Sequence, residues 1–305
     1  MKTLSLFLLL ALAGCSIVHG DEFTQEEGCD LELKVRGFSP HVIDVTQIFL
    51  TRANQDGSQR RNEAVAVFDP LGAPNLDLRM PGAVRPRTNP NQGLASIDFF
   101  ADFDDTEGFS AGDHTWTLDD ACTTGPELFP HNTDFTAIRE PVSQGAAIGV
   151  RFCDLPPRLS RAAVEVRVTR ILPDETNPDE VVNQAIAFYR LDDAGRRPEG
   201  ITIPRVANVD FDLLVEVVAD LNGNGVFDGT DLAWSYRHSR DAQIRCTDVA
   251  ILNRTTFCPI VSPMMLPRVP ACVHEGNLVV ILDNAFENNE ESTLSSGPWF
   301  QFVPE

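Results

Sequence analysis

Short apolar runs recur along the whole chain, and residues typical of turns separate them. The runs are rich in β-branched and aromatic residues, and they show almost no helical periodicity. Glycine (20 residues) and proline (21 residues) mark the intervals between them. This pattern predicts many β-strands, and strands without intervening helices favour antiparallel sandwiches. The clearest runs are 42–51, 63–69, 95–102, 162–171, 183–190 and 211–220.

The chain also contains an internal repeat. Two stretches, 101–116 and 219–234, share alanine, aspartate, phenylalanine, aspartate and tryptophan in register. The dipeptides Thr51-Arg52 and Thr169-Arg170 recur at the same offset of 118 residues, each at the end of an alternating run. Tandem copies of one β-domain explain these matches. The alternative is two unrelated hairpins that share turn chemistry.

We therefore expect an all-β protein with two tandem antiparallel β-sandwich domains, resembling immunoglobulin-like or transthyretin-like domains. Trp116 and Trp234 are expected to pack in the two cores. The runs 279–283 and 298–303 are expected to form a C-terminal hairpin that packs on the second domain. The expected ranges are 29–140 for the first domain, 146–257 for the second and 258–305 for the C-terminal extension.

Acidic residues dominate the charge of the chain. There are 45 carboxylates against 24 lysines and arginines, and the formal net charge is −21. Each contact with a phosphate needs a local cation, so nucleic acid is not an expected partner. Hydrophobic residues make up 43% of the chain, which is enough to build cores and excludes global disorder.

The first residues have the features of an export signal. Lys2 precedes an apolar run of about ten residues, too short to span a bilayer comfortably. The run ends in Leu12-Ala13-Gly14-Cys15, which resembles the lipobox of bacterial lipoproteins. The resemblance implies a signal peptide at 1–14, acyl chains such as palmitate on Cys15, and a polar tether over 15–28. Ser16 favours sorting to the outer membrane in that family. The alternative is an ordinary secretory signal with a chance cysteine.

Residues 220–231, DLNGNGVFDGTD, place oxygen-bearing groups at the positions that an EF-hand-type calcium loop requires. The loop resembles those of dockerin repeats and of calcium-binding B-type repeats in bacterial surface proteins. It departs from the EF-hand because an aspartate closes it and no helix follows. Gly225 stands at the sharp turn. The expected calcium ligands are Asp220, Asn222, Asn224, the Val226 carbonyl, Asp228 and Asp231.

The corresponding stretch of the first copy, 102–113, is a weaker match because Glu107 replaces the turn glycine. Both loops have a simpler interpretation as plain turns, since aspartate, asparagine and glycine favour turns without any metal. The expected ligands of this second candidate site are Asp102, Asp104, Thr106, Ser110 and Asp113.

Six cysteines remain after Cys15 is set aside, and an even number in an exported protein suggests three disulfides. Six cysteines allow fifteen pairings. The separations Cys29–Cys122 and Cys153–Cys246 are both 93 residues, and each first cysteine begins a Cys-Asp-Leu tripeptide. We therefore expect these two pairs, with Cys258–Cys272 closing a small loop.

Several catalytic motifs are missing from the sequence. It contains no CxxC, HExxH, P-loop or GxGxxG pattern, and its one GxSxG match, 108–112, lies within the acidic stretch 102–113. The histidines are scattered; Asp113-His114 with the nearby His131 could form a catalytic group, but isolated polar residues on loops are common. We expect no enzymatic activity, and a lipid-anchored cell-envelope protein with calcium and the Cys15 lipid as its attached groups. Its role would be structural, adhesive or ligand-binding. The alternative is an envelope hydrolase that uses acidic-loop carboxylates on glycan or peptidoglycan.

Overall fold

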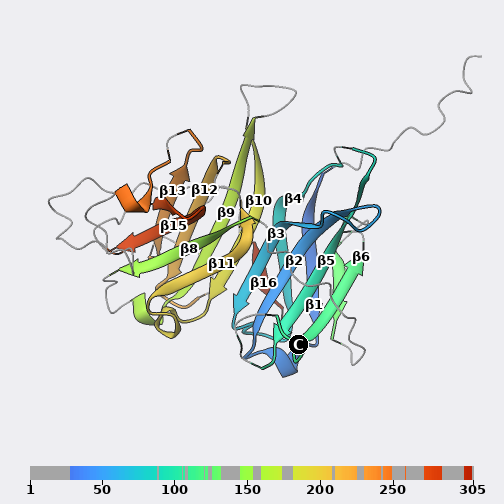
Figure 1. Ribbon diagram of the computed structural model, residues 1–305. Coiled ribbons are helices and arrows are strands. Elements are labelled where there is room, and N and C mark those ends of the chain that lie inside the picture. Colours follow the sequence, from blue (N-terminus) through green and yellow to red (C-terminus); the bar gives the residue numbers. More distant parts are fainter. Residues whose placement is uncertain are drawn as a thin grey trace, which may run out of the picture.

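The protein is described here by a computed structural model. The structure describes residues 28–303 apart from 88, 105, 107–108, 120, 123–125, 132–144, 154–158, 174–180, 208–209, 225–229, 242, 249–257, 259–270 and 284–298. Within those residues the chain is all-β, as the sequence predicts, and its helices are short 3₁₀ turns (Figure 1). None of the described helices is long and apolar enough to cross a membrane.

The described strands fall into two halves with a short last strand. The strands of the first half are β1 Cys29–Arg36, β2 Val45–Asn54, β3 Arg61–Asp69, β4 Leu76–Val84, β5 Gln92–Asp102, β6 His114–Asp119 and β7 Glu127–Pro130. Those of the second half are β8 Ala146–Cys153, β9 Ala163–Pro173, β10 Val181–Leu191, β11 Gly200–Ala207, β12 Leu213–Asp220, β13 Leu232–His238, β14 Ala271–His274 and β15 Asn277–Asp283. The last strand is β16 Phe300–Phe302, and the 3₁₀ turns are η1 Ser39–His41, η2 Leu159–Arg161, η3 Ala194–Arg196 and η4 Cys246–Asp248.

One eight-stranded sheet runs through both halves, in the order β13-β12-β9-β10-β3-β2-β5-β6 (Figure 1). The halves meet where β3 and β10 pair in parallel, from Val65 opposite Ala187 to Asp69 opposite Leu191. The other neighbours in this sheet are antiparallel. The two sandwiches therefore share a sheet, an arrangement that hydrophobic periodicity alone does not predict.

Two four-stranded sheets complete the sandwiches, in the orders β16-β4-β1-β7 and β11-β8-β15-β14. They cover opposite faces of the large sheet, because alternate residues of β3 enter different cores. Ala64, Ala66 and Phe68 pack in the first core with β1 and β4. Val65 and Val67 pack in the second core with β8 and β9. Burying one large apolar side chain contributes about 1.5–3 kcal/mol to stability, and the large sheet buries such side chains on both of its faces.

Corresponding strands have the same neighbours in both halves. The order β3-β2-β5-β6 matches β10-β9-β12-β13, and β4-β1-β7 matches β11-β8-β15. Both β7 and β15 pair in parallel, with β1 and β8 respectively. Trp116 and Trp234 lie on matching strands and are 5% and 2% exposed, in the first and second cores. Their predicted core positions are confirmed.

The end of the chain differs from the expected hairpin of 279–283 with 298–303. β15 forms a hairpin with β14 instead, through a turn at Glu275 and Gly276, and also pairs with β8. β16 pairs with β4 of the first half, and Trp299 packs in the first core. β15 occupies the place beside β8 that β7 occupies beside β1 in the first half.

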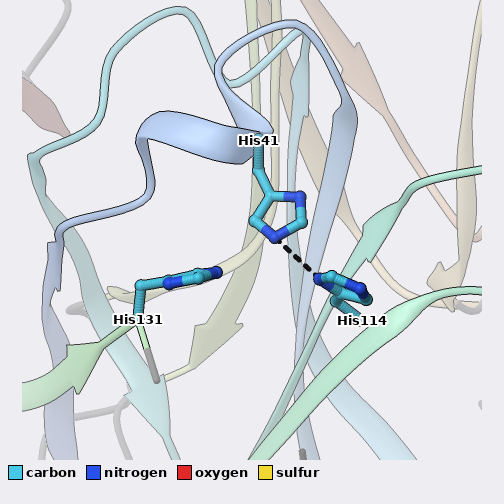
Figure 2. A group of neighbouring side chains, drawn as sticks. All are labelled: His41, His114 and His131. Atoms are coloured by element: carbon cyan, nitrogen blue, oxygen red, sulfur yellow. Dashed lines mark hydrogen bonds between the residues drawn. The ribbon is translucent and has the colours of Figure 1, made fainter. Parts of the chain in front are cut away.

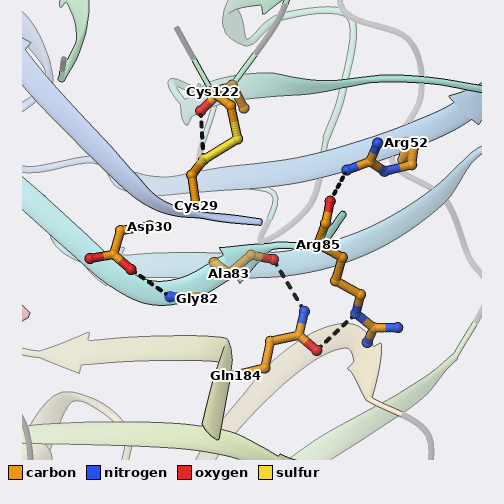
Figure 3. The surroundings of a disulfide bond; sticks show 9 residues. Cys29, Asp30, Arg52, Gly82, Ala83, Arg85, Cys122 and Gln184 are labelled. Carbon is orange, nitrogen blue, oxygen red and sulfur yellow. Dashed lines mark hydrogen bonds between the residues drawn. A yellow bond between two sulfur atoms is a disulfide. The ribbon is translucent and has the colours of Figure 1, made fainter. Parts of the chain in front are cut away.

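Polar side chains also connect the two halves at the seam, the region where β10 lies beside β3 and contacts β4. Gln184 of β10 donates to the Ala83 carbonyl at 3.2 Å and accepts from Arg85 Nε at 2.8 Å (Figure 3). At the other end of the seam, the buried carboxylate of Asp69 accepts from Tyr189 at 3.0 Å and from Arg197 Nε at 2.8 Å. Because these hydrogen bonds cross the boundary between the halves, the seam favours one fixed arrangement of them.

Three disulfides form, and one of the expected pairs is confirmed, Cys29–Cys122 (Figure 3). The other two pairs are Cys153–Cys258 and Cys246–Cys272, so the predicted Cys153–Cys246 and Cys258–Cys272 pairs are wrong. Cys29 begins β1, whereas Cys153 ends the matching strand β8. Cys29 and Cys153 therefore lie at opposite ends of equivalent strands, and the equal separation was a coincidence.

Candidate metal sites

Loop 102–113 joins β5 to β6 and brings three predicted calcium ligands together. Carboxylate oxygens of Asp102, Asp104 and Asp113 lie within 4.8 Å of one another. Asp102 is buried at the end of β5, Asp104 is exposed, and Asp113 immediately precedes β6. The antiparallel pairing of β5 with β6 holds the two ends of the loop side by side. This is the loop that the sequence matched less well.

Donors within the loop orient these carboxylates. Thr106 and Ser110 donate their hydroxyls to the two oxygens of Asp104 at 2.8 and 2.6 Å. Asp113 accepts from the backbone N–H of Phe103 at 3.1 Å and of Ser110 at 2.6 Å. Hydrogen bonds from Ser110 and Thr106 lower the pKa of Asp104, whereas burial raises the pKa of Asp113. The five predicted ligands thus form one cluster that also satisfies the geometry of a turn.

Loop 220–231 is described in part, and its ends have the same construction. Asp231 Oδ1 accepts from the Leu221 N–H at 2.9 Å, as Asp113 accepts from Phe103 in the first half. Asp220 Oδ1 accepts from the Gly223 N–H at 2.7 Å, and Asn222 Oδ1 from the Asn224 N–H at 2.9 Å. The two loops therefore close in the same way.

Two of the predicted ligands of this loop, Val226 and Asp228, lie outside the described residues. Its first residues, including Asp220, border a cleft that Arg161, Arg190 and Asp192 also line, and Arg190 pairs with Asp192 at 3.0 Å. Among the described residues, converging carboxylates are found in loop 102–113, so this loop is the better-defined candidate for a cation site.

A second cluster lies beside loop 102–113, and it consists of His41, His114 and His131 (Figure 2). His41 ends η1, His114 begins β6, and His131 follows β7, where its N–H donates to the Arg36 carbonyl at 2.8 Å. One ring nitrogen from each histidine lies within 4.8 Å of the other two. The sequence showed only scattered histidines, because their neighbourhood exists only once β1, β5 and β7 bring these segments together.

Hydrogen bonds fix the orientation of two of the rings. His41 Nδ1 lies 2.8 Å from Asp44 Oδ2, and His41 Nε2 lies 3.0 Å from His114 Nδ1. In the neutral form of His41 the carboxylate accepts the Nδ1 proton, which leaves the lone pair on the Nε2 atom. His41 is fully buried, and His114 and His131 are partly exposed.

The surroundings of His114 and His131 favour the neutral forms of these two rings. Burial lowers the pKa of His114, and the neighbouring His41 lowers it further. Burial also lowers the pKa of His131, with a smaller contribution from His114. Aromatic rings form the walls: Phe103 stacks on His114 at a centroid distance of 5.0 Å, and Trp116 lies 5.7 Å from His41.

The remaining sequence-predicted site, Cys15 with its signal peptide, lies outside the described residues. Of the twelve predicted calcium and lipid positions, the structure therefore brings together those of loop 102–113 and the ends of loop 220–231. The chain matches no protein-family model, no curated protein and no solved structure.

Proposed function

We propose that the chain is an exported, lipid-anchored protein of the bacterial cell envelope, with a calcium-braced loop on a β-sandwich scaffold. The three disulfides support export, because such bonds persist in oxidising compartments. Acyl chains on Cys15 would hold it on the outer membrane, since more than one chain makes a stable anchor.

Its proposed role is structural, adhesive or ligand-binding, without catalysis. The converging carboxylates support this role over a glycan hydrolase. A glycosidase needs two carboxylates that face each other across a bound sugar. In loop 102–113 three carboxylates instead approach one another, and Asp104 lies exposed on the loop. This arrangement suits the coordination of an ion better than the cleavage of a glycosidic bond.

The convergence of Asp102, Asp104 and Asp113 is the observation that carries the calcium proposal. Calcium takes six to eight oxygen ligands, and carboxylates, hydroxyls, carbonyls and waters all serve. Thr106 and Ser110 contribute hydroxyl oxygens within the same cluster. Three negative charges so close together repel one another, and a divalent cation would relieve that repulsion.

The expected contribution of calcium to stability is modest. Extracellular calcium modules bind with a Kd of about 10⁻⁴–10⁻³ M. At about 1 mM calcium, the stronger end of that range contributes about 1–1.5 kcal/mol to the free energy of unfolding. The ion would therefore brace the loop against opening, while the two cores and the disulfides hold the fold.

Thermal unfolding of the full chain in detergent tests the calcium proposal. Adding about 1 mM calcium should raise the Tm of the wild type by about 2–5 °C. Asp104→Asn should abolish most of that rise, because it removes a charge from the cluster and keeps an acceptor oxygen.

Asp56→Asn is the matched control. Asp56 also accepts from a neighbouring hydroxyl and N–H, those of Ser58, on an exposed turn. It should respond to calcium like the wild type. A wild-type Tm that neither calcium nor magnesium changes would exclude the brace.

A further inference from the structure

We propose that His41, His114 and His131 form a binding site for a divalent transition-metal ion of the zinc class, separate from the calcium loop. The three imidazoles converge from η1, β6 and the end of β7 on one point (Figure 2). This inference does not depend on the proposed function, since it uses other residues and another kind of ligand atom.

The spacing of the nitrogen atoms suits a tetrahedral ion. With a Zn–N distance of about 2.05 Å, two ligand nitrogens of a tetrahedron lie about 3.3 Å apart. His41 Nε2 and His114 Nδ1 are 3.0 Å apart, and the nitrogen of His131 lies within 4.8 Å of both. Closing the triangle requires a small rotation of His131, which is partly exposed and follows the last residue of its strand.

Asp44 supplies the outer-shell contact that metal-binding histidines commonly have. Its carboxylate lies 2.8 Å from His41 Nδ1 and so directs the lone pair of His41 Nε2 into the cluster. Without an ion, His114 Nδ1 donates to that lone pair. Metal binding requires His114 to adopt the other tautomer, with its proton on Nε2, and no net proton is lost.

His131 provides an independent observation. Its Nε2 atom is buried and has no hydrogen-bond partner among the described residues. A buried polar atom without a partner costs about 1–3 kcal/mol, and such atoms are uncommon unless a water or ion satisfies them. Because imidazole nitrogens of two other histidines lie close to His131, a bound ion would supply the partner that this atom lacks.

The second half of the molecule shows that the sandwich does not need these histidines. His41 is the last residue of η1, and the last residue of the matching η2 is the exposed Arg161. His114 begins β6, and Leu232 begins the matching β13. The same strand order forms without imidazoles at these places, so a purely architectural role does not explain the cluster.

The donor set identifies the class of ion. Three neutral imidazoles suit zinc, copper, cobalt or nickel, whereas calcium and magnesium prefer oxygen. Three protein ligands leave a fourth position for water or an external ligand. His114 and His131 are partly exposed, so the cluster lies close to the surface of the molecule.

Titration of the full chain with Co²⁺ tests the site, since tetrahedral Co²⁺ absorbs strongly in the visible region. The wild type should bind one ion per chain with a tetrahedral spectrum, and Zn²⁺ should displace it. A large excess of Ca²⁺ should leave the spectrum unchanged. His131→Gln should weaken binding more than 100-fold, and Asp44→Asn about 10–100-fold.

His274→Gln is the matched control, because His274 is a partly exposed histidine outside the cluster. It should bind Co²⁺ like the wild type. Circular dichroism reports whether each variant folds. Should His131→Gln fail to fold, the wild-type spectrum and Asp44→Asn still decide. A wild-type protein that gives no tetrahedral Co²⁺ spectrum would overturn the proposal. Equal weakening of Co²⁺ binding by His274→Gln and by Asp44→Asn would also overturn it.

Discussion

The two halves of the molecule place matching strands in the same order, but they differ in the polar side chains at matching positions. Arg52 and Arg170 lie near the ends of β2 and β9, each in a Thr-Arg dipeptide. Arg52 is buried and hydrogen-bonds to Glu63, Gly93 and Arg85. Arg170 instead lies over the ring of Phe211, at 3.4 Å from its centroid.

The buried carboxylates of β5 and β12 differ in the same way. Asp98 accepts from Thr51 at 3.1 Å and from Thr117 at 3.0 Å, and it also pairs with Arg60. At the matching place Glu216 is also buried, and burial raises its pKa while Arg167 lowers it. Apolar alternation is thus enough to build the scaffold twice, and the polar chemistry on it has diverged.

The largest expected difference between the halves concerns the two arginines. Arg52→Ala leaves Glu63 buried without its closest partner, so it should cost about 3–5 kcal/mol in the free energy of unfolding. Arg170→Ala removes a contact with an aromatic ring and should cost about 1 kcal/mol. Burial also lowers the pKa of Arg170 to about 10, so its charge is already disfavoured. Urea unfolding of both variants measures the difference, and equal costs would show that the two sites are equivalent after all.

Asp69→Ala tests whether the shared sheet makes the halves unfold together. It removes the acceptor of both Tyr189 and Arg197 at the seam. Because Arg197 is partly exposed, the expected cost is about 2–3 kcal/mol, below that of a fully buried pair. Calorimetry of the wild type should show a single transition, and the variant should shift or split it. Two separate transitions in the wild type would show that the halves unfold independently despite the shared sheet, which would contradict this expectation.

Glu216→Gln should have the smallest effect, and a favourable one. The pKa of Glu216 is raised in the folded state, so its contribution to stability is complete below the unfolded pKa and falls as the pH rises through the folded pKa. At neutral pH the buried charge therefore opposes folding, and its removal should add less than about 1 kcal/mol. The gain should vanish near pH 4. A gain that is the same at pH 4 and pH 7 would assign the effect to packing instead.

Much of the fold follows from the sequence because strand alternation and turn residues are local signals. The runs at 42–51 and 183–190 lie within β2 and β10 or begin just before them, and both tryptophans are buried as expected. The Cys29–Cys122 pair is also present, although the equal separation from which it was predicted is a coincidence. The strands and the buried tryptophans depend on patterns among residues near one another in the chain.

The features that the sequence missed all depend on which strands become neighbours. Two of these features, the parallel pair β3–β10 and the pairing of β16 with β4, are choices between similar hydrogen-bonding edges of strands. The pairing of Cys153 with Cys258 depends on which segment lies beside the end of β8. The histidine cluster has the same origin. His41, His114 and His131 come from three segments, and no short motif marks them. The nearby Asp113-His114 pair was the one local signal.

Calorimetric titration of the full chain with calcium measures directly whether the protein binds this ion. We expect saturable binding with a Kd of about 10⁻⁴–10⁻³ M. Asp104→Asn should remove the binding at loop 102–113, and Asp220→Asn should remove any binding at loop 220–231. Wild-type protein that takes up no calcium at millimolar concentrations, or a double variant that binds as the wild type does, would contradict the calcium brace.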